Sequence, residues 1–238
     1  MSVLAVENLR KSFRAPDGDS TLIVDIPTFG MDEGAHVGLR GASGSGKTTF
    51  LNLIAGILQA DAGTVRVADK VLTSLTESGR DLLRARAIGY VFQNFNLLQG
   101  YTALENVMLG MLFGVGVDRG RARQLLERVG LSHRLNYRPS QMSIGQQQRV
   151  AVARALANRP KLVLADEPTG NLDQRHAGEA LALIREICEE NNAALLVVSH
   201  DPVVLSAFAR VEDLAVINRA SAAHSPSGDI RIPAGAHA

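Results

Sequence analysis

Tryptophan is absent from this chain of 238 residues, aromatic residues make up only 4%, and there is a single cysteine. One cysteine excludes an intramolecular disulfide framework and a cysteine-rich metal site. The formal charge is only +1 at pH 7. A general nucleic-acid binder needs a strongly basic surface, so no nucleic-acid partner is expected.

Long hydrophobic runs are also missing. The longest apolar or glycine-containing run covers residues 107–117, which is shorter than the roughly 18–20 residues needed to span a bilayer. The N-terminal residues carry neither a basic region nor a long apolar segment, so no secretory signal is predicted. We therefore expect a cytoplasmic protein that reaches the inner face of the cell membrane only through a partner.

What the chain does contain is short apolar runs alternating with longer segments of helical periodicity. Strands are predicted at residues 2–9, 21–26, 36–40, 65–68, 88–92, 162–165, 194–198 and 211–217. Helices are predicted at residues 48–58, 121–129, 146–158 and 174–191, and helical spacing begins near residue 101. This alternation indicates an α/β fold with a mainly parallel sheet, into which a helical subdomain at about 95–140 is inserted. Residues 219–238, rich in Ala, Ser, Pro and Gly, are expected to form a flexible tail.

A glycine-rich loop follows the strand predicted at 36–40. Its sequence is Gly41-Ala42-Ser43-Gly44-Ser45-Gly46-Lys47-Thr48, the pattern of a phosphate-binding P-loop. Glycines allow backbone N–H groups to converge on phosphate oxygens, and a helix that begins near Lys47 adds the positive end of its dipole. We expect Lys47 to reach the β- and γ-phosphates and the Thr48 hydroxyl to bind Mg²⁺.

Two adjacent carboxylates end a buried strand much further along the chain. The segment is Leu162-Val163-Leu164-Ala165-Asp166-Glu167. A P-loop site needs an acidic residue on a distant strand to hold the metal, and Asp166 is predicted to be that residue. Glu167, one residue later, is placed to polarise an attacking water as a general base.

A third motif, Met142-Ser143-Ile144-Gly145-Gln146 followed by a basic and polar helix, lies between the first two. With all three motifs in this order, the chain resembles the nucleotide-binding subunits of ABC transporters over about residues 2–218. The resemblance implies a P-loop ATPase domain over 1–218. It also implies an antiparallel β subdomain, and a helical subdomain at 95–140 completed by the signature helix to 158. The expected ligands are ATP and Mg²⁺.

In the resembling family the signature completes an ATP site across a head-to-tail dimer, a role that falls here on Ser143, Gly145 and Gln146. The family usually has glycine where this chain has Ile144. A β-branched side chain resists positive φ and blocks close backbone approach. Two interpretations stay open: an ordinary helical backbone that tolerates Ile144, or a weakened closure of the composite site with slow ATP turnover.

The same resemblance assigns roles to four further residues. His200 matches the histidine that contacts the γ-phosphate, and Gln93 matches the glutamine that approaches Mg²⁺ and the attacking water. Asp173 lies in the loop expected to cross the dimer interface, and Phe13 matches the aromatic residue that stacks on adenine. The implied catalytic residues are Lys47, Gln93, Glu167 and His200, and the implied metal ligands are Thr48, Gln93 and Asp166. The implied nucleotide site consists of Phe13, the loop Gly41 to Thr48, Thr49, Gln93, Ser143, Gly145, Gln146, Asp166 and Asp173.

Three stretches, residues 96–98, 102–107 and 167–173, resemble the ATPases of the lipoprotein-release, macrolide-export and cell-division group. The resemblance therefore implies an ATPase that works with a second copy of itself and an integral membrane permease, as an exporter or a mechanotransmission device. Two alternatives remain open at this stage. One is a soluble ABC-type ATPase of an assembly pathway, of the iron–sulfur kind, and the other is a regulator of a membrane enzyme.

Overall fold

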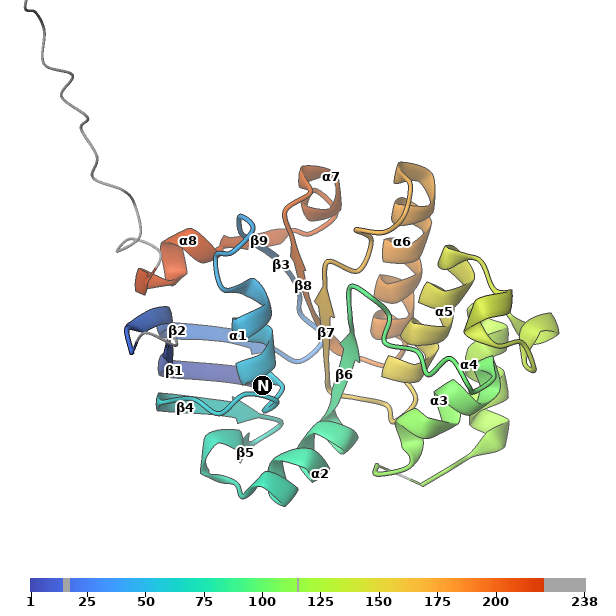
Figure 1. The fold of residues 1–238 in the computed structure, drawn as a ribbon, viewed down its shortest axis with the longest axis horizontal. Coiled ribbons are helices and arrows are strands. Elements are labelled where there is room, and N and C mark those ends of the chain that lie inside the picture. Colours follow the sequence, from blue (N-terminus) through green and yellow to red (C-terminus); the bar gives the residue numbers. More distant parts are fainter. Residues whose placement is uncertain (15–17, 115, 221–238) are drawn as a thin grey trace, which may run out of the picture.

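A computed structural model describes residues 1–14, 18–114 and 116–220 and contains two β-sheets flanked by helices (Figure 1). The first sheet is antiparallel, with the strand order β2-β1-β4-β5. The second has the order β6-β7-β8-β3-β9, and all its neighbouring strands are parallel. Figure 1 shows the antiparallel sheet at one end of the molecule, helices α3 to α5 at the other, and the parallel strands between them.

The elements have the following bounds. The antiparallel sheet comprises β1 (Ser2–Arg14), β2 (Ser20–Asp32), β4 (Ala62–Val67) and β5 (Lys70–Val71). The parallel sheet comprises β3 (His36–Arg40), β6 (Ile88–Val91), β7 (Leu162–Asp166), β8 (Ala194–Ser199) and β9 (Arg210–Asp213). The helices are α1 (Lys47–Ile54), α2 (Glu77–Ala87), α3 (Ala103–Met111), α4 (Arg119–Arg128), α5 (Ile144–Ala155), α6 (Gln174–Glu190), α7 (Pro202–Leu205) and α8 (Leu214–Ile217). Three short 3₁₀ turns lie at Leu72–Ser74, Ser132–Arg134 and Pro139–Gln141.

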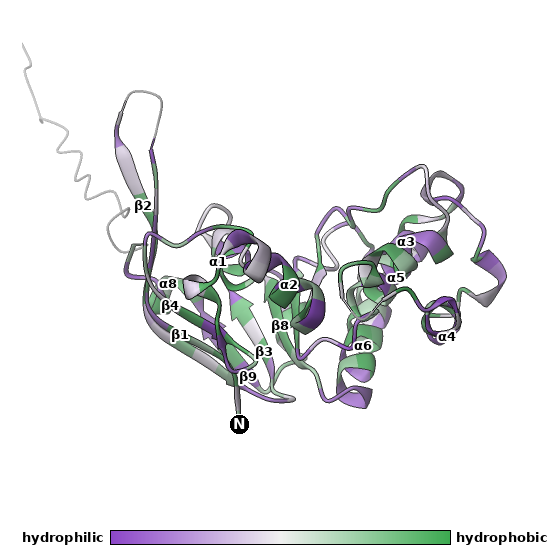
Figure 2. Ribbon diagram, turned by 90° about the horizontal axis from the view of Figure 1, so that it is seen from below, coloured by the Kyte–Doolittle hydropathy of each residue, from purple (hydrophilic) through white to green (hydrophobic). Residues whose placement is uncertain are grey.

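The parallel sheet is covered on both faces, which explains why its central strands are continuous apolar runs. In β8, Leu195 and Val197 pack into a core that also contains residues of α3 to α6. Their neighbours Leu196 and Val198 pack into a second core with α1 and the antiparallel sheet. Figure 2 shows β8 as a largely hydrophobic strand inside the molecule. Successive side chains of a strand point to opposite faces, so one run of apolar residues supplies both cores.

Strand register brings the ends of four strands to one edge of the parallel sheet. Arg40 lies opposite Ser199, and Asp166 lies opposite Val198. On the other side of β7, Ala165 lies opposite Val91. The segments that follow β3, β6, β7 and β8 therefore emerge together, and these are the segments in which the sequence placed its candidate site residues.

Several predicted boundaries were wrong, each for a local reason. Residues 211–217, predicted to form one strand, divide into β9 and α8, because the Asp213 side chain accepts a hydrogen bond from Ala215 N and caps a helix. The helix predicted at 48–58 ends at Ile54, before Gly56, which adopts a φ of +67°. Helix α2 was not predicted, because its sequence is strongly polar and only Leu83 and Ala87 are buried along it.

The first turns of α3 and α5 are fixed by capping boxes. The Thr102 side chain accepts from Glu105 N, and the Glu105 carboxylate accepts from Thr102 N. The same exchange joins Ser143 and Gln146, so α5 begins two residues before the predicted start at 146. Each reciprocal pair satisfies two backbone N–H groups that a helix start leaves without partners.

Among the described residues, no helix is both long enough and apolar enough to cross a membrane. The tail expected at 219–238 lies outside the described residues, apart from its first two residues. Its predicted flexibility therefore stays a prediction.

The first prediction concerns Asn106, which is fully buried under the segment that leads into α3. Its Oδ1 accepts from Leu98 N, and its Nδ2 donates to the carbonyl oxygens of Leu98, Tyr101 and Thr102 at 3.0–3.2 Å. Replacing Asn106 by Ala removes these bonds and leaves buried backbone groups unpaired. We expect Asn106→Ala to lower the free energy of unfolding by about 2–4 kcal/mol in urea titrations.

The exposed Asn94 supplies the matched control for this measurement. We expect Asn94→Ala to change the free energy of unfolding by no more than about 0.5 kcal/mol. Equal effects of the two substitutions would contradict a structural role for the Asn106 amide.

Candidate functional site

The P-loop connects β3 to α1 and depends on glycines with positive φ. Gly44 has a φ of +77° and Gly46, the N-cap of α1, a φ of +94°. A Cβ at position 46 would also lie 3.1 Å from the carbonyl oxygen of Ile23. Glycine is the residue that meets both demands without strain. This backbone geometry is the one expected of a phosphate-binding loop at the start of a helix.

The Lys47 ammonium lies within the concave side of this loop. Its Nζ donates to the carbonyl oxygens of Gly41 at 2.7 Å and Ala42 at 2.9 Å. The same atom lies 3.6 Å from Glu167 Oε1. The cation is thus held between the loop and the acidic strand end, where a phosphate group bound by the loop would meet it.

Thr48 and Asp166 meet, as the sequence predicted. Thr48 Oγ1 donates to Asp166 Oδ2 at 2.8 Å, while Asp166 Oδ1 is buried and has no hydrogen-bond partner. Burial raises the pKa of Asp166, the negative charge of Glu167 adds to this effect, and the Thr48 hydrogen bond opposes it. A buried carboxylate oxygen without a partner, beside a hydroxyl, is a suitable donor set for Mg²⁺.

The donor chemistry also fits the way Mg²⁺ usually binds. Across residues 1–14, 18–114 and 116–220, no group of three or more His, Cys, Asp or Glu side chains is arranged to hold a metal ion. Mg²⁺ normally takes one or two protein carboxylates and completes its shell with water and substrate phosphates. One carboxylate and one hydroxyl at a phosphate-binding loop match that pattern.

Glu167 is held by three hydrogen bonds and only 8% of it is exposed. Its Oε2 accepts from Ser199 Oγ at 3.0 Å. Its Oε1 accepts from His200 N at 3.1 Å and lies 2.7 Å from His200 Nδ1. The residue adopts a φ of +43°, a left-handed conformation that is unusual for a side chain of this size. Residues held in sparsely populated backbone conformations cluster at functional sites.

The contact with Glu167 also bears on which ring nitrogen of His200 carries a proton. Because a carboxylate only accepts, Nδ1 of the imidazole carries the proton in this arrangement. The Nε2 atom of a neutral ring is then an acceptor, and it donates to a phosphate oxygen only when the ring is charged. The His200 side chain is 69% exposed, so Nε2 is free to face a ligand.

Most of the predicted site residues line one cavity of about 720 Å³, a size typical of small-molecule sites. Its lining comprises Phe13, Ile23, Ala42, Ser43, Gly44, Gly46, Lys47, Thr48, Thr49, Gln93, Asp166, Glu167 and His200. Gly41 and Ser45 belong to the same loop but do not line the cavity. Ile23 was not predicted, and its place in strand β2 gave no signal of a role at the site.

Four predicted residues lie elsewhere on this chain. Ser143, Gly145 and Gln146 form the start of α5, and none of them lines the cavity. Asp173 caps α6 by accepting from His176 N and is also outside it. In Figure 1, α5 and α6 lie on the side of β7 opposite α1. One chain alone therefore does not bring the signature to the phosphate loop.

Ile144 occupies the first position of α5, without a positive φ, and is 53% exposed. The backbone is thus ordinary helix at this residue, as the first of the two interpretations expected.

Two residues with contacts to the site were missed by the sequence analysis. Ser199 holds Glu167, and Asn171 Nδ2 donates to the carbonyl oxygen of Gln93 at 2.8 Å. Ser199 directly precedes His200, so its position at the end of a strand was the available signal. Asn171 belongs to the same loop as Asp173, but its contact with Gln93 depends on tertiary structure that spacing does not reveal.

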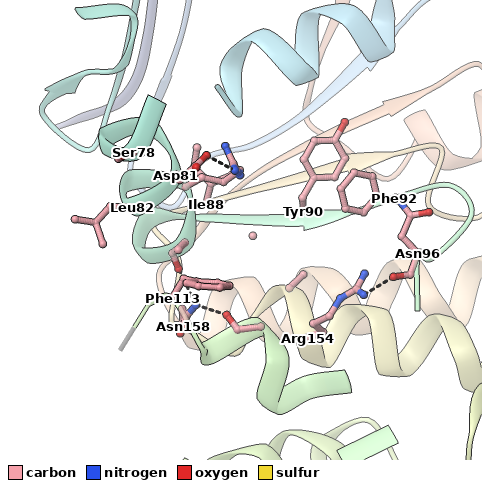
Figure 3. Close-up of a pocket in the computed structure, with 15 residues that line it drawn as sticks. Ser78, Asp81, Leu82, Ile88, Tyr90, Phe92, Asn96, Phe113, Arg154 and Asn158 are labelled. Carbon is pink, nitrogen blue, oxygen red and sulfur yellow. Dashed lines mark hydrogen bonds and ion pairs between the residues drawn. The ribbon is translucent and has the colours of Figure 1, made fainter. Parts of the chain in front are cut away.

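A second cavity, of about 740 Å³, lies between α2, β6 and the C-terminal half of α5 (Figure 3). Leu82 from α2 and Phe113 from the segment after α3 border it. The Tyr90 and Phe92 rings stack with their centroids 4.1 Å apart.

Burial, together with the nearby charge of Asp166, raises the pKa of the Tyr90 hydroxyl, which donates to Asn52 Oδ1. This hydroxyl therefore stays protonated.

A phosphate loop, a buried acid with an open ligand position and a strained carboxylate paired with histidine define a P-loop ATPase. The family model described as ABC transporter matches residues 24–170, and the chain belongs to this family, as its ATP-binding ATPase domain. The predicted family and fold class are thereby confirmed.

Relatives with known names agree with this assignment. The lipoprotein-releasing system ATP-binding protein LolD of Pseudomonas syringae is 45% identical over 84% of this chain and 89% of its own length. The macrolide export ATP-binding/permease protein MacB of Rhodopirellula baltica is 41% identical over 98% of this chain, but over 37% of its own length. One similar solved structure is titled as a dimeric post-hydrolysis state of the ATP-binding cassette MJ0796 bound to ADP and Pi. It has a TM-score of 0.81 and 34% sequence identity, and the match covers 88% of this chain and 93% of that chain.

The second prediction follows from the buried charge of Asp166. Asn has the same shape as Asp and can still accept from Thr48, but it removes a desolvated negative charge. We expect Asp166→Asn to raise the free energy of unfolding by about 1 kcal/mol in magnesium-free buffer. We also expect the variant to lose any dependence of ATP affinity on Mg²⁺. Urea titration and ATP-binding titrations with and without Mg²⁺ measure the two effects.

The exposed Asp32 provides the control, since Asp32→Asn removes the same charge from a solvated position. That variant should keep its stability within about 0.5 kcal/mol. A destabilised Asp166→Asn that still binds ATP in a Mg²⁺-dependent manner would disprove the assignment.

Proposed function

We propose that this chain is the ATP-binding subunit of an ABC transporter, in which two copies hydrolyse ATP and drive an integral membrane permease. One observation carries the proposal. The phosphate loop, the Thr48–Asp166 pair and the Glu167–His200 pair face one cavity, while the signature residues lie outside that cavity on the same chain. We assign the ATPase domain to residues 1–218, with the helical subdomain at 95–140 and the signature helix to 158, and 219–238 as a tail.

In this proposal the loop from Gly41 to Thr48, together with Thr49, holds the phosphates of ATP. The Phe13 ring is 42% exposed at the cavity and offers a face on which adenine stacks. Lys11 Nζ lies 5.7 Å from the centre of that ring, so a cation occupies its neighbourhood as well. Lys47 contacts the β- and γ-phosphates by moving its ammonium from the loop carbonyls to the phosphate oxygens.

Mg²⁺ is proposed to bind to Thr48 Oγ1, Asp166 Oδ1 and the side chain of Gln93. When bound, this ion neutralises charge on the β- and γ-phosphates. The protein supports the site by keeping Asp166 buried next to the hydroxyl of Thr48, with one carboxylate oxygen left without a hydrogen-bond partner in the described part of the chain.

Hydrolysis requires a water oxygen to attack the γ-phosphorus in line with the bond to the leaving ADP. We assign the proton acceptor to Glu167, whose carboxylate Ser199 and His200 hold at the cavity. Gln93 orients the water, His200 contacts the γ-phosphate, and Lys47 stabilises the developing charge. The γ-phosphorus forms a bond to the water oxygen while its bond to the ADP oxygen breaks, giving ADP and phosphate.

The signature completes the site of a second chain in this proposal. Gly145 supports it, because it lies in the first turn of α5 without a positive φ, and nothing lies within 4 Å of where its Cβ would be. Glycine at such a helix position costs up to about 1 kcal/mol, and the fold of this chain gives no reason for it. The close approach of a ligand held by another chain would explain why position 145 is a glycine. Ser143, Gln146 and Asp173 are assigned to the same contact.

We place the contact with the permease at the second cavity, because this cavity is an apolar hollow bordered by residues on both sides of Gln93. Its border includes Leu82 and Phe113, which are 45% and 73% exposed. A short helix of the membrane partner with an apolar face fits such a groove. This contact would hold the subunit at the inner face of the membrane. The LolD and MacB relatives support an exporter or mechanotransmission type of partner.

The third prediction tests the chemistry of Glu167. Gln keeps the size of the side chain but does not take a proton from water. We expect Glu167→Gln to bind ATP and dimerise while turnover falls by about 10²–10⁴-fold. Phosphate release measures turnover, and light scattering with and without ATP measures the dimer. The exposed Glu127 on α4 serves as control, since Glu127→Gln should leave both unchanged. Normal turnover in Glu167→Gln would show that the base is misassigned.

The same variant identifies the partner. The tagged Glu167→Gln chain, trapped with ATP and crosslinked in its native cell, should co-purify from membranes with an integral membrane protein. A partner with few spans and a large external domain supports mechanotransmission, and a permease with many spans indicates ordinary translocation. Recovery only with a soluble assembly factor would overturn the transporter assignment and leave the ATPase chemistry in place.

The fourth prediction concerns Ile144. Its helical φ shows that the fold does not need glycine here, and its exposed side chain lies beside the face assigned to the second chain. We expect Ile144→Gly to leave dimer-dependent turnover within about twofold and to lower the free energy of unfolding by about 0.5 kcal/mol. A rise in turnover of roughly tenfold would instead establish that Ile144 weakens closure.

A further inference from the structure

Arg154 lies in the last turn of α5 and donates to two successive backbone carbonyls of the segment that follows Gln93. Its Nη1 lies 2.6 Å from Asn96 O and its Nη2 lies 2.6 Å from Phe95 O. Figure 3 shows the guanidinium reaching from the helix towards Asn96. The planar fork of arginine matches two neighbouring acceptors, whereas a lysine ammonium is a single point charge on a flexible stem.

The two residues that accept these bonds have an unusual backbone. Phe95 has a φ of +58° and Asn96 a φ of +48°, so two residues with side chains are left-handed in succession. This conformation brings Cβ too close to the following carbonyl, and residues other than glycine rarely adopt it in succession. The segment therefore needs external contacts to persist. The buried Phe95 side chain provides one, and the two hydrogen bonds from Arg154 provide another.

Arg154 has no acidic partner in the part of the chain that the structure describes, since no carboxylate there lies within 4.0 Å of it. Burial lowers the pKa of its guanidinium from the ordinary value. A desolvated cation without an ion pair is costly, and carbonyl dipoles are its compensation. The two carbonyls of the Gln93 segment and this cation thus stabilise each other.

Helix α5 joins this contact to the signature. The helix begins at Ile144, with Ser143 as its N-cap and Gly145 in its first turn, and it carries Arg154 near its other end, so one rigid element holds both. On the other side of the segment, Asn171 Nδ2 donates to Gln93 O. We propose that Arg154 is a positioning residue for ATP hydrolysis. It fixes the segment after Gln93 to the signature helix, so that a displacement of α5 moves Gln93. This inference rests on the roles proposed above for Gln93 and the signature.

Arg121 of α4 supplies a matched comparison. Its Nε donates to Ala157 O at 2.8 Å and its Nη2 donates to Leu156 O at 3.2 Å. Burial also lowers the pKa of this guanidinium. Both arginines therefore bind two backbone carbonyls near the C-terminal end of α5 under similar desolvation. Only Arg154 contacts the segment that follows Gln93.

The first experiment compares Arg154→Met with Arg121→Met in the full chain. Hydrogen exchange of the amides of residues 95–98 should accelerate by roughly tenfold or more in Arg154→Met and stay unchanged in Arg121→Met. The kcat for ATP should fall by about 10–100-fold in Arg154→Met, with the Kd for ATP within about threefold of wild type, because misplacement of a group near the reacting atoms costs rate and not ground-state binding. Equal exchange and equal kcat in the two variants would overturn the proposal.

A double-mutant cycle with Gln93→Ala then separates positioning from general stability. If Arg154 acts through Gln93, Arg154→Met should change kcat by less than about threefold in the Gln93→Ala background. The same fold-loss in both backgrounds would overturn the proposal.

Arg154→Lys is the milder variant, needed if Arg154→Met does not fold. It retains the charge but not the fork, and it should show an intermediate loss of kcat in the same cycle. Wild-type exchange and kcat in Arg154→Lys would disprove the bidentate role. Failure of the wild-type chain to hydrolyse ATP would count against the proposed function, while the exchange comparison would still decide whether Arg154 holds the segment.

Discussion

The burial of Asp166 and Glu167 is the constraint on which the rest of the site depends. Two adjacent carboxylates with 6% and 8% exposure are costly in a protein interior unless their environment compensates for the lost water. The compensation comes from outside the strand that carries them. Thr48 donates to Asp166, and Ser199 and His200 donate to Glu167. One Asp166 oxygen keeps no hydrogen-bond partner among the described residues, and under the proposed function this oxygen binds Mg²⁺.

The parallel register makes this compensation possible, because strands with far-separated sequence positions end at the same edge of the sheet. Arg40, which leads into the phosphate loop, lies opposite Ser199, and Asp166 lies opposite Val198. A shift of one residue in any of these pairings would turn the acidic side chains towards the opposite face of the sheet. Burial of both faces of the sheet sets that register. The packing of the two cores therefore fixes the positions of the site side chains.

Much of this arrangement could be predicted from the sequence, because the phosphate loop, the acidic pair and His200 each directly follow an apolar strand. The contacts that could not be predicted cross between elements far apart in the chain. Ser199, Asn171 and Arg154 make polar contacts whose partners carry no spacing signal. Helix α2 was missed for a different reason, since its sequence is strongly polar and only Leu83 and Ala87 are buried along it. The strand predicted at 211–217 was wrong in its second half, because Asp213 caps a helix there.

Under the proposed function, the site of one chain is incomplete, and this bears on how hydrolysis is controlled. In that proposal the cavity holds the groups that bind phosphate and activate water, whereas Gly145 has open space around it and belongs to a helix start outside the cavity. Arg154 of α5 binds the left-handed residues after Gln93, and Asn171 binds the carbonyl oxygen of Gln93 itself. A second chain that binds the start of α5 would therefore also affect Arg154 near the other end of the same helix. Under the proposed function, closure of the dimer and the placement of Gln93 then occur together. A membrane partner bound at the apolar cavity beside Arg154 would be in contact with the elements that move.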